Sequence, residues 1–298
     1  GLFDLRAATQ LASLLMAFML VLVFAERASR SARIRRAERR TVPNRIVLRG
    51  ARGWAATALQ SAVLLLAVVI PLVQLLAWSL PSIGDMLDAD SLRLIGNTVL
   101  LGALGAIGVV AGGLVLLLAG YRASRRFTLL SELAASGYAI PGTVLAVAIM
   151  LALTGVDRVL ETTLAGGLLA LLLAYLIRFV RVAWGPLEGV AARIRPELFE
   201  SARSLGASRW ERLWRVMLPL LRPGLATAFL LALVEIAKEM PATLMLRPFG
   251  WDTLAIRIYE LTAEGQWERA ALPALFLVVL GAIPAVLLMR RLGGRAAD

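Results

Sequence analysis

Residues 193–224, RIRPELFESARSLGASRWERLWRVMLPLLRPG, contain two blocks of apolar residues at helical spacing. The first block follows Pro196, which is favoured at a first helical turn, and it ends at Gly206, a typical C-terminal stop. Ser208 and Glu211 have the spacing of a capping box that starts a second helix. That helix is expected to run until Pro219. The stretch therefore predicts two short amphipathic helices joined by a glycine turn.

The segments around this stretch are long and apolar. Apolar residues make up 59% of the chain, and the charged residues cluster between the apolar runs. A helix that spans a bilayer needs about 20 apolar residues, and its backbone polar groups must be satisfied within the segment. Seven segments meet this requirement: residues 5–24, 54–79, 94–119, 129–153, 163–184, 223–246 and 270–289. We therefore expect an all-α polytopic membrane protein.

The net charge of +12 would suit nucleic-acid binding, but the distribution of arginines favours a membrane topology. Arginines concentrate in alternate loops, at 25–53, 122–126, 178–222 and 290–295, and the intervening loops are acidic or balanced. This is the positive-inside pattern, and it places the basic loops and the C-terminus in the cytoplasm. The 25–53 run is interpreted as a topology anchor and linker, with binding of anionic lipid as the alternative.

The chain contains no cysteine and no histidine. Disulfides, thiolate metal sites and imidazole chemistry are therefore excluded. There is also no phosphate-binding glycine loop and no nucleophile–base pair, so we expect neither catalysis nor a metal site in this chain. It begins at Gly1 without a signal-peptide cleavage pattern, which suggests a processed or truncated piece.

Two local patterns within the spans predict helix packing. Gly108 and Gly112 are spaced as a small-xxx-small pair, which lets helices approach closely. Pro141 lies in SGYAIPGTVLAVA between Gly137 and Gly142, and we expect it to kink the span at 129–153.

A further apolar run, FLLALVEIAKEMPATLML at 229–246, carries three ionisable residues near its middle: Glu235, Lys238 and Glu239. Spacings of three and four residues place all three on one helical face. At about 1.5 Å per residue from Pro223, Glu235 lies about 18 Å along the span, close to the bilayer midplane. Charges are expensive there, so two main interpretations remain open, beside a misplaced span boundary. Either the group is a structural ion pair, or it lines a translocation pathway or its gate together with Pro241.

The spacing Glu200-Ser201-Ala202, Gly206, Val216, Leu218-Pro219 resembles the EAA loop of ABC-importer permeases. Ser201 replaces an alanine and Val216 an isoleucine of the family pattern. YAIPGTVLAVA, KEMPATLMLRPFGWDTLAIRIYE and AALPAL are similar to the ferric-iron subfamily, in which two six-span halves are commonly fused. The similarity covers about 54–292 and matches the second half. It implies the type I ABC-importer permease fold, with a six-span core plus one extra N-terminal span.

The resemblance also implies a domain organisation. Residues 1–26 resemble the last span of a preceding permease half, 27–53 form a basic cytoplasmic linker, and 54–292 form the permease domain. The coupling loop lies at about 190–222, and the protein is expected in the bacterial inner membrane. The residues implied to couple to the ATPase are Glu200, Ser201, Ala202, Leu205, Gly206, Leu218 and Pro219.

The partners implied by the resemblance are a dimer of cytoplasmic ATPase subunits, an extracytoplasmic substrate-binding protein, the other permease half and membrane lipid. ATP and magnesium would bind to the ATPase, so this chain itself needs no cofactor. The other half would be a separate chain, a missing segment or a second copy. The outer segment at 247–269 predicts an interfacial helix that either anchors in lipid or meets the binding protein.

Two alternatives to ferric-iron import stay open. One is an importer for another small solute, such as an oxyanion, thiamine or a phosphonate. The other is a secondary transporter that uses the Glu235, Lys238 and Glu239 group as an ion relay.

Overall fold

The computed structural model describes residues 48–81, 84, 88–120 and 135–293, together with Leu14, Ala17, Phe18 and Val21. The predicted span at 5–24, and the basic linker as far as residue 47, lie outside these residues apart from the four named ones, which are helical. Within the described residues, six helical segments are long and apolar enough to cross a membrane: 51–79, 89–120, 142–160, 168–191, 209–237 and 267–287. They confirm the six predicted spans of the core, with changed ends.

The first described span is an exposed helix with a change of pitch in its middle. α2 (Ala51–Leu64) continues through a π-helical segment, Leu65–Val69, into α3 (Ile70–Ser79). Pro71 lies in the first turn of α3 and has no N–H to donate to the preceding turn, so the wider π spacing is accommodated at this point. α3 packs on α13 (Trp267–Gly293), whereas α2 has no buried residue.

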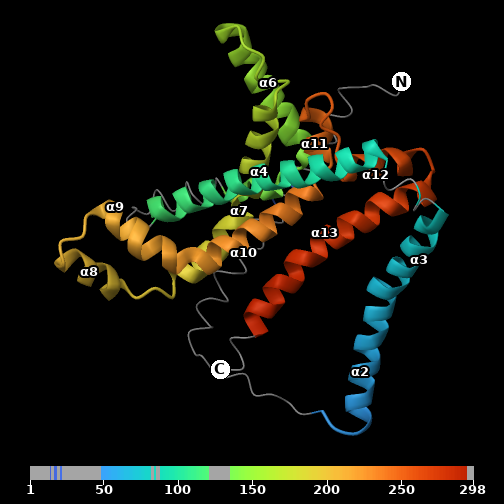
Figure 1. The fold of residues 1–298 in the computed structure, drawn as a ribbon, viewed down its shortest axis with the longest axis horizontal. Helices are drawn as coiled ribbons and strands as arrows, with labels where there is room; N and C mark the ends of the chain where they lie inside the picture. The colour runs from blue at the N-terminus through green and yellow to red at the C-terminus, as the bar shows by residue number, and fades with distance from the viewer. Residues whose placement is uncertain are drawn as a thin grey trace.

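The centre of the molecule is formed by α4 (Ala89–Gly120), α7 (Leu168–Ala191) and α10 (Leu218–Ala237), which pack on one another (Figure 1). The close approach occurs at Gly105 and Gly112. An added Cβ would lie 2.8 Å from Ile236 Cδ1 at Gly105, and 2.6 Å from Leu176 Cδ1 at Gly112. A Cβ at Gly108 would meet nothing within 4 Å, so the predicted pairing of Gly108 with Gly112 is wrong.

The predicted span at 129–153 is also corrected. A 3₁₀ turn, η3 (Ala135–Ala139), is followed by Pro141 as the N-cap of α6 (Gly142–Leu160), so a helix starts where a kink was expected. A proline disfavours helical conformation in the residue before it, and it fits well at a helix start. The second half of α6 extends away from the other helices and exposes Leu151 and Val159 (Figure 1).

The loop that connects α7 to α10 contains one separate helix rather than two. α8 (Pro196–Ser204) is a separate short helix, as predicted. α9 (Arg209–Glu211) runs without a break through a π-helical segment, Arg212–Met217, into α10. The prediction that Pro219 ends the second helix is wrong, because Pro219 falls in the first turn of α10, after the π segment.

The predicted span at 223–246 is divided into two helices. α10 ends at Ala237, with Lys238 as its C-cap, and the short helix α11 (Pro241–Leu246) begins at Pro241. Because Pro241 cannot donate a backbone hydrogen bond, it suits the start of a new helix and not the interior of a long one. The predicted outer helix is present as α12 (Leu254–Ala263), which packs against α13.

Candidate functional site

The glycine turn after α8 has the geometry of a Schellman motif. The N–H of Ala207 donates to the carbonyl of Ala202, and the N–H of Gly206 donates to that of Arg203, both at 3.0 Å. Gly206 has a φ of 82°, in the left-handed region that glycine adopts without steric cost. These bonds satisfy the last carbonyls of α8 and fix the direction in which the chain leaves it.

The next helix starts at once with the predicted capping box. The N–H of Glu211 donates to Ser208 Oγ at 3.2 Å, and the N–H of Ser208 donates to Glu211 Oε2 at 2.9 Å. Only Ala207 separates the Schellman glycine from this cap. The Schellman turn that ends α8 and the capping box that starts α9 therefore fix the orientation of these two helices relative to each other.

α8 presents both polar and apolar side chains to the surface. Leu205 is 88% exposed, and Leu198 of α8 and Trp210 of α9 are exposed as well. Phe199 instead packs against the core. Glu200 and Ser201 are exposed on the same short helix. Exposed apolar side chains on this ordered knob, residues 196–208, make it a candidate interaction surface.

The predicted coupling residues do not all lie together. Glu200, Ser201 and Ala202 belong to α8, and Leu205 and Gly206 form the turn that follows it. Leu218 and Pro219 lie in the first turn of α10 and are partly buried. The two groups are linked through the π-helical segment, which α8 contacts.

The charged triplet separates into two ion pairs. Lys238 Nζ lies 2.9 Å from Glu235 Oε1, and their side chains are 51% and 29% exposed. Glu239 is 7% exposed, and its Oε2 lies 3.0 Å from Arg178 Nε of α7. The expectation of one shared helical face is wrong for Glu239, because α10 ends before this residue.

Arg178 was missed as a site residue because it was assigned to the cytoplasmic arginine cluster. Its signal in the sequence is a single arginine after the apolar run LLALLLAYLI, ten residues into α7. Its Nη1 also donates to the carbonyl of Ile140, directly before Pro141. Arg178 therefore joins α7 to the start of α6 as well as to the end of α10.

Glu239 serves a second structural role at the start of α11. Its Oε1 accepts a hydrogen bond from the N–H of Ala242 at 3.1 Å, so the carboxylate caps α11. Thr243 Oγ1 donates to the carbonyl of Glu239 and lies 2.8 Å from the hydroxyl of Tyr175. We call Tyr175, Arg178, Glu239 and Thr243 the polar junction.

The polar junction requires a glycine at position 142. A Cβ added there would lie 2.6 Å from Glu239 Oε1 and 3.2 Å from Pro241 Cβ. The first turn of α6 therefore packs directly on the break between α10 and α11. This contact brings together two proline-containing segments, AIPG at 139–142 and EMPA at 239–242.

The depth of these charges follows from the helix packing. A Cβ added at Gly224 would lie 3.1 Å from Val190 Cγ2, so these residues share one level of the α7–α10 contact. Arg178 lies about 18 Å along α7 from Val190, and Glu235 lies about 17 Å along α10 from Gly224. The arginines that follow Val190 mark a membrane boundary. Both ion pairs are therefore expected inside the roughly 30 Å hydrocarbon core.

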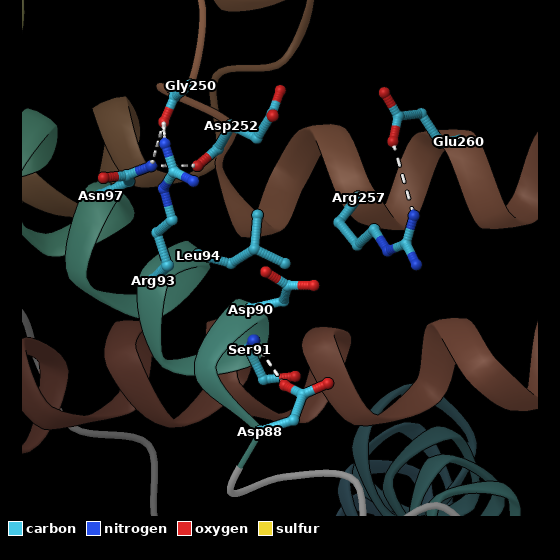
Figure 2. Close-up of a pocket in the computed structure, with 10 residues that line it drawn as sticks. All are labelled: Asp88, Asp90, Ser91, Arg93, Leu94, Asn97, Gly250, Asp252, Arg257 and Glu260. Atoms are coloured by element: carbon cyan, nitrogen blue, oxygen red, sulfur yellow. Dashed lines mark hydrogen bonds and ion pairs between the residues drawn. The ribbon is translucent and has the colours of Figure 1, made fainter.

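A polar cleft of about 330 Å³ lies between the start of α4 and the segment 250–260 (Figure 2). Arg93 and Asn97 of α4 converge on Gly250, whose carbonyl accepts from Arg93 Nη2 at 3.2 Å and from Asn97 Nδ2 at 3.0 Å. Asn97 also donates to the carbonyl of Asp252. These bonds hold the loop after α11 against α4.

The lining of this cleft contains more carboxylates than guanidinium groups. The carboxylates are Asp88, Asp90, Asp252 and Glu260, and the guanidinium groups are Arg93 and Arg257. The N–H of Ser91 donates to Asp88 Oδ1 at 2.7 Å and holds the pKa of that carboxyl below its usual value. Asp252 Oδ1 forms an ion pair with Arg247 Nε at 2.6 Å. The cleft is thus an acidic surface with most of its charges held in place.

Six helices able to cross a membrane, with an ordered and exposed knob between two of them, fit a polytopic permease of the type I ABC-importer class. The sequence supports this directly. Residues 106–298 match the model of the family described as binding-protein-dependent transport system inner membrane component, and the chain belongs to this family.

Two curated relatives differ in their stated substrates. The Fe(3+)-transport system permease protein FbpB 2 of Haemophilus influenzae is 28% identical over 236 residues, covering 77% of this chain and 46% of that protein. PhnV of Salmonella typhimurium, named for a 2-aminoethylphosphonate transport system, is 42% identical over 99 residues, covering 33% of this chain and 36% of that protein. The chain spans about half the length of the first relative and about a third of the second.

The fold is similar to that of solved transporters. A chain of a bacterial ABC transporter for import of the acidic polysaccharide alginate superposes with a TM-score of 0.61 at 17% identity, covering 80% of this chain and 96% of that one. A second structure of an alginate transporter, with its periplasmic protein bound, gives a TM-score of 0.60. At this identity the likeness shows the fold alone.

Proposed function

We propose that the chain forms half of the translocation pathway of a ferric-iron importer and couples that pathway to ATP hydrolysis on a partner subunit. The relative with the widest coverage among those above, FbpB 2, is named for Fe(3+) transport, and this supports the substrate. The segments around Pro141 and Pro241, which resemble the ferric subfamily, meet at the polar junction. No covalent chemistry is assigned to this chain, and ATP with magnesium belongs to the ATPase.

The observation that carries the coupling role is the ordered, exposed knob at 196–208. A Schellman turn and a capping box fix its geometry, and Leu205 is almost fully exposed. We assign it as the contact with the ATPase, with Glu200, Ser201 and Ala202 on its helix. Leu218 and Pro219 would transmit its movement, because they begin the helix that ends at the charged pair.

We assign different roles to the two ion pairs. Glu239 and Arg178 connect α7, the start of α6 and the start of α11, and we assign this pair a structural role. Glu235 and Lys238 are partly exposed on this chain at membrane depth, where contact with lipid would be costly. That surface therefore faces the other permease half or an aqueous pathway, and we propose that this pair lines the pathway or its gate, next to Pro241.

Two further partners follow from this role. A second permease half is needed, as a separate chain, as a segment of a longer polypeptide or as a second copy. An extracytoplasmic binding protein would deliver the substrate, and the acidic cleft beside α4 is a suitable surface for it. The arginine-rich loops support a cytoplasmic location of the coupling knob and of the C-terminus.

Uptake of radiolabelled ferric iron by cells that carry the complete transport operon tests the substrate. Deletion of this chain should abolish uptake, and Glu235→Gln or Lys238→Met should reduce it about tenfold or more while the protein stays in the membrane. Normal iron uptake in the deletion strain would contradict the proposal.

A second candidate substrate is 2-aminoethylphosphonate, because PhnV has the higher identity, 42%, over the stretch that it matches. The same cells can be tested for growth on this compound as the sole phosphorus source. Growth that depends on this chain, without iron uptake, would favour the phosphonate. A secondary transporter is disfavoured, because the family is ATP-coupled and such a protein needs no ATPase contact.

A further inference from the structure

A cavity of about 370 Å³ lies at the base of the coupling knob and shares Leu198 with it. It is formed where the end of α7, the start of α8 and the first turns of α10 meet. Its lining is Val190, Arg193, Ile194, Arg195, Leu198, Leu220 and Pro223. The wall is thus aliphatic apart from two arginines.

The two arginines are free to bind a ligand. Arg193 and Arg195 are exposed, and neither guanidinium forms an ion pair or hydrogen bond with another described residue. Arg195 is the N-cap residue of α8, and Arg193 lies two residues after the end of α7. Two arginines that line one cavity without carboxylate partners among the described residues suit a phosphate, which guanidinium groups can bind through paired hydrogen bonds.

The cavity lies at the level where the helices leave the membrane. Val190, in its wall, contacts α10 beside Gly224, and Pro186 of α7 approaches the same glycine. This close packing bounds the cavity toward the membrane interior. Leu198 and Leu220 remain exposed at its edge. A ligand here would need an anionic head for the arginines and an aliphatic portion for the wall.

We propose that this cavity binds the phosphate and adjoining acyl carbons of an anionic phospholipid. Basic pockets between membrane helices are suited to such headgroups. The bound lipid would brace the start of α8, because Arg195 occupies the N-cap position of that helix and Leu198 belongs to it. Anionic lipid would then strengthen the coupling between this knob and α10.

The test is a titration of phosphatidylglycerol, with phosphatidylcholine for comparison, into the purified transporter in detergent. Bound lipid is counted by native mass spectrometry. We expect tighter binding of phosphatidylglycerol, and about tenfold or greater weakening in the Arg193→Gln/Arg195→Gln variant, since each basic residue near an anionic headgroup changes affinity about fivefold. Leu220→Trp should also weaken lipid binding, because the larger side chain would fill part of the cavity.

The matched control is Arg209→Gln/Arg290→Gln, which removes the same charge from exposed arginines outside the cavity. Equal lipid binding by the control and the test variant would overturn the proposal, as would equal binding of the two lipids by the unaltered protein. If the Arg193→Gln/Arg195→Gln variant loses the ATPase subunit while its lipid binding is unchanged, the two arginines contact a protein and not a lipid. Because lipid is counted directly, this test can fail while iron transport persists.

Discussion

At the residue scale, neighbouring charges have opposite environments. Lys238 is half-exposed and pairs with Glu235 on its own helix, whereas Glu239 is buried against Arg178 of α7. The difference arises because α10 ends at Ala237, and the chain then turns into α11. A buried charge is tolerated only when it is paired and hydrogen-bonded, and Glu239 has both an ion pair and the N–H of Ala242.

We expect Gly142→Ala to destabilise the protein and reduce transport strongly, because the added methyl would overlap Glu239 Oε1. The matched control is Gly108→Ala, where the same methyl meets nothing within 4 Å. Thermal unfolding of the purified proteins in detergent would measure the difference. Equal melting temperatures for the two variants would show that α6 does not pack on the polar junction in this way.

The Arg178–Glu239 pair should show strong coupling in a double-mutant cycle. Removing one partner of a buried ion pair costs about 3–5 kcal/mol, because the other charge is left unpaired. We therefore expect Arg178→Met and Glu239→Met each to be strongly destabilising, and the double variant to lose much less than their sum. The measurement is the free energy of unfolding in detergent.

Glu235→Gln provides the comparison for this cycle. Its pair with Lys238 is partly exposed to the proposed aqueous pathway, and a pair in contact with water contributes roughly 1 kcal/mol or less. Additive effects of Arg178→Met and Glu239→Met would argue against the buried pair.

At the element scale, the residues that end α8 and start α9 fix the orientation of the coupling knob, residues 196–208. Gly206 ends α8 and Ser208 starts the next helix, so no flexible linker separates them. We therefore expect a movement of α8 to pass through the π-helical segment into α10. Pro219 and Pro223 do not interrupt this path, because the helix continues to Ala237.

Gly206→Val should abolish coupled transport without preventing membrane insertion. A β-branched residue is strongly disfavoured at a φ of 82°, so the turn after α8 would be rebuilt. Co-purification of the ATPase subunit and substrate-stimulated ATP hydrolysis would both report the loss.

Gly265→Val is the control for this substitution. Gly265 has a similar φ of 76° and open surroundings, but it lies between α12 and α13, away from the knob. It imposes comparable backbone strain and should retain the ATPase subunit. Loss of the ATPase in both variants would indicate general misfolding rather than a specific contact.

At the scale of the whole molecule, the topology can be tested because the chain contains no cysteine. A cysteine introduced at Glu264, in the turn after α12, should react with a membrane-impermeant maleimide in intact spheroplasts. A cysteine at Arg209 or Arg290 should react only after permeabilisation. The reverse labelling pattern would place the coupling knob outside the cell and contradict the proposed orientation.

The features that could be predicted from the amino-acid sequence are those that depend on neighbouring residues. Six of the predicted spans, the glycine turn and the capping box follow from composition and short spacings, and all of these are present in the described residues. Local chemistry sufficed because a cap or a turn is completed within a few residues. The span at 5–24 and the linker to residue 47 stay predictions.

Only the tertiary structure decided where the helices break and which charges meet. Arg178 and Glu239 are 61 residues apart in sequence, and no periodicity relates them. The break after α10 depends on Pro241, and the start of α6 depends on Pro141. A proline can either bend a helix or begin one. Packing selected the second outcome, because only separate helices bring the N–H of Ala242 and the carbonyl of Ile140 to this ion pair.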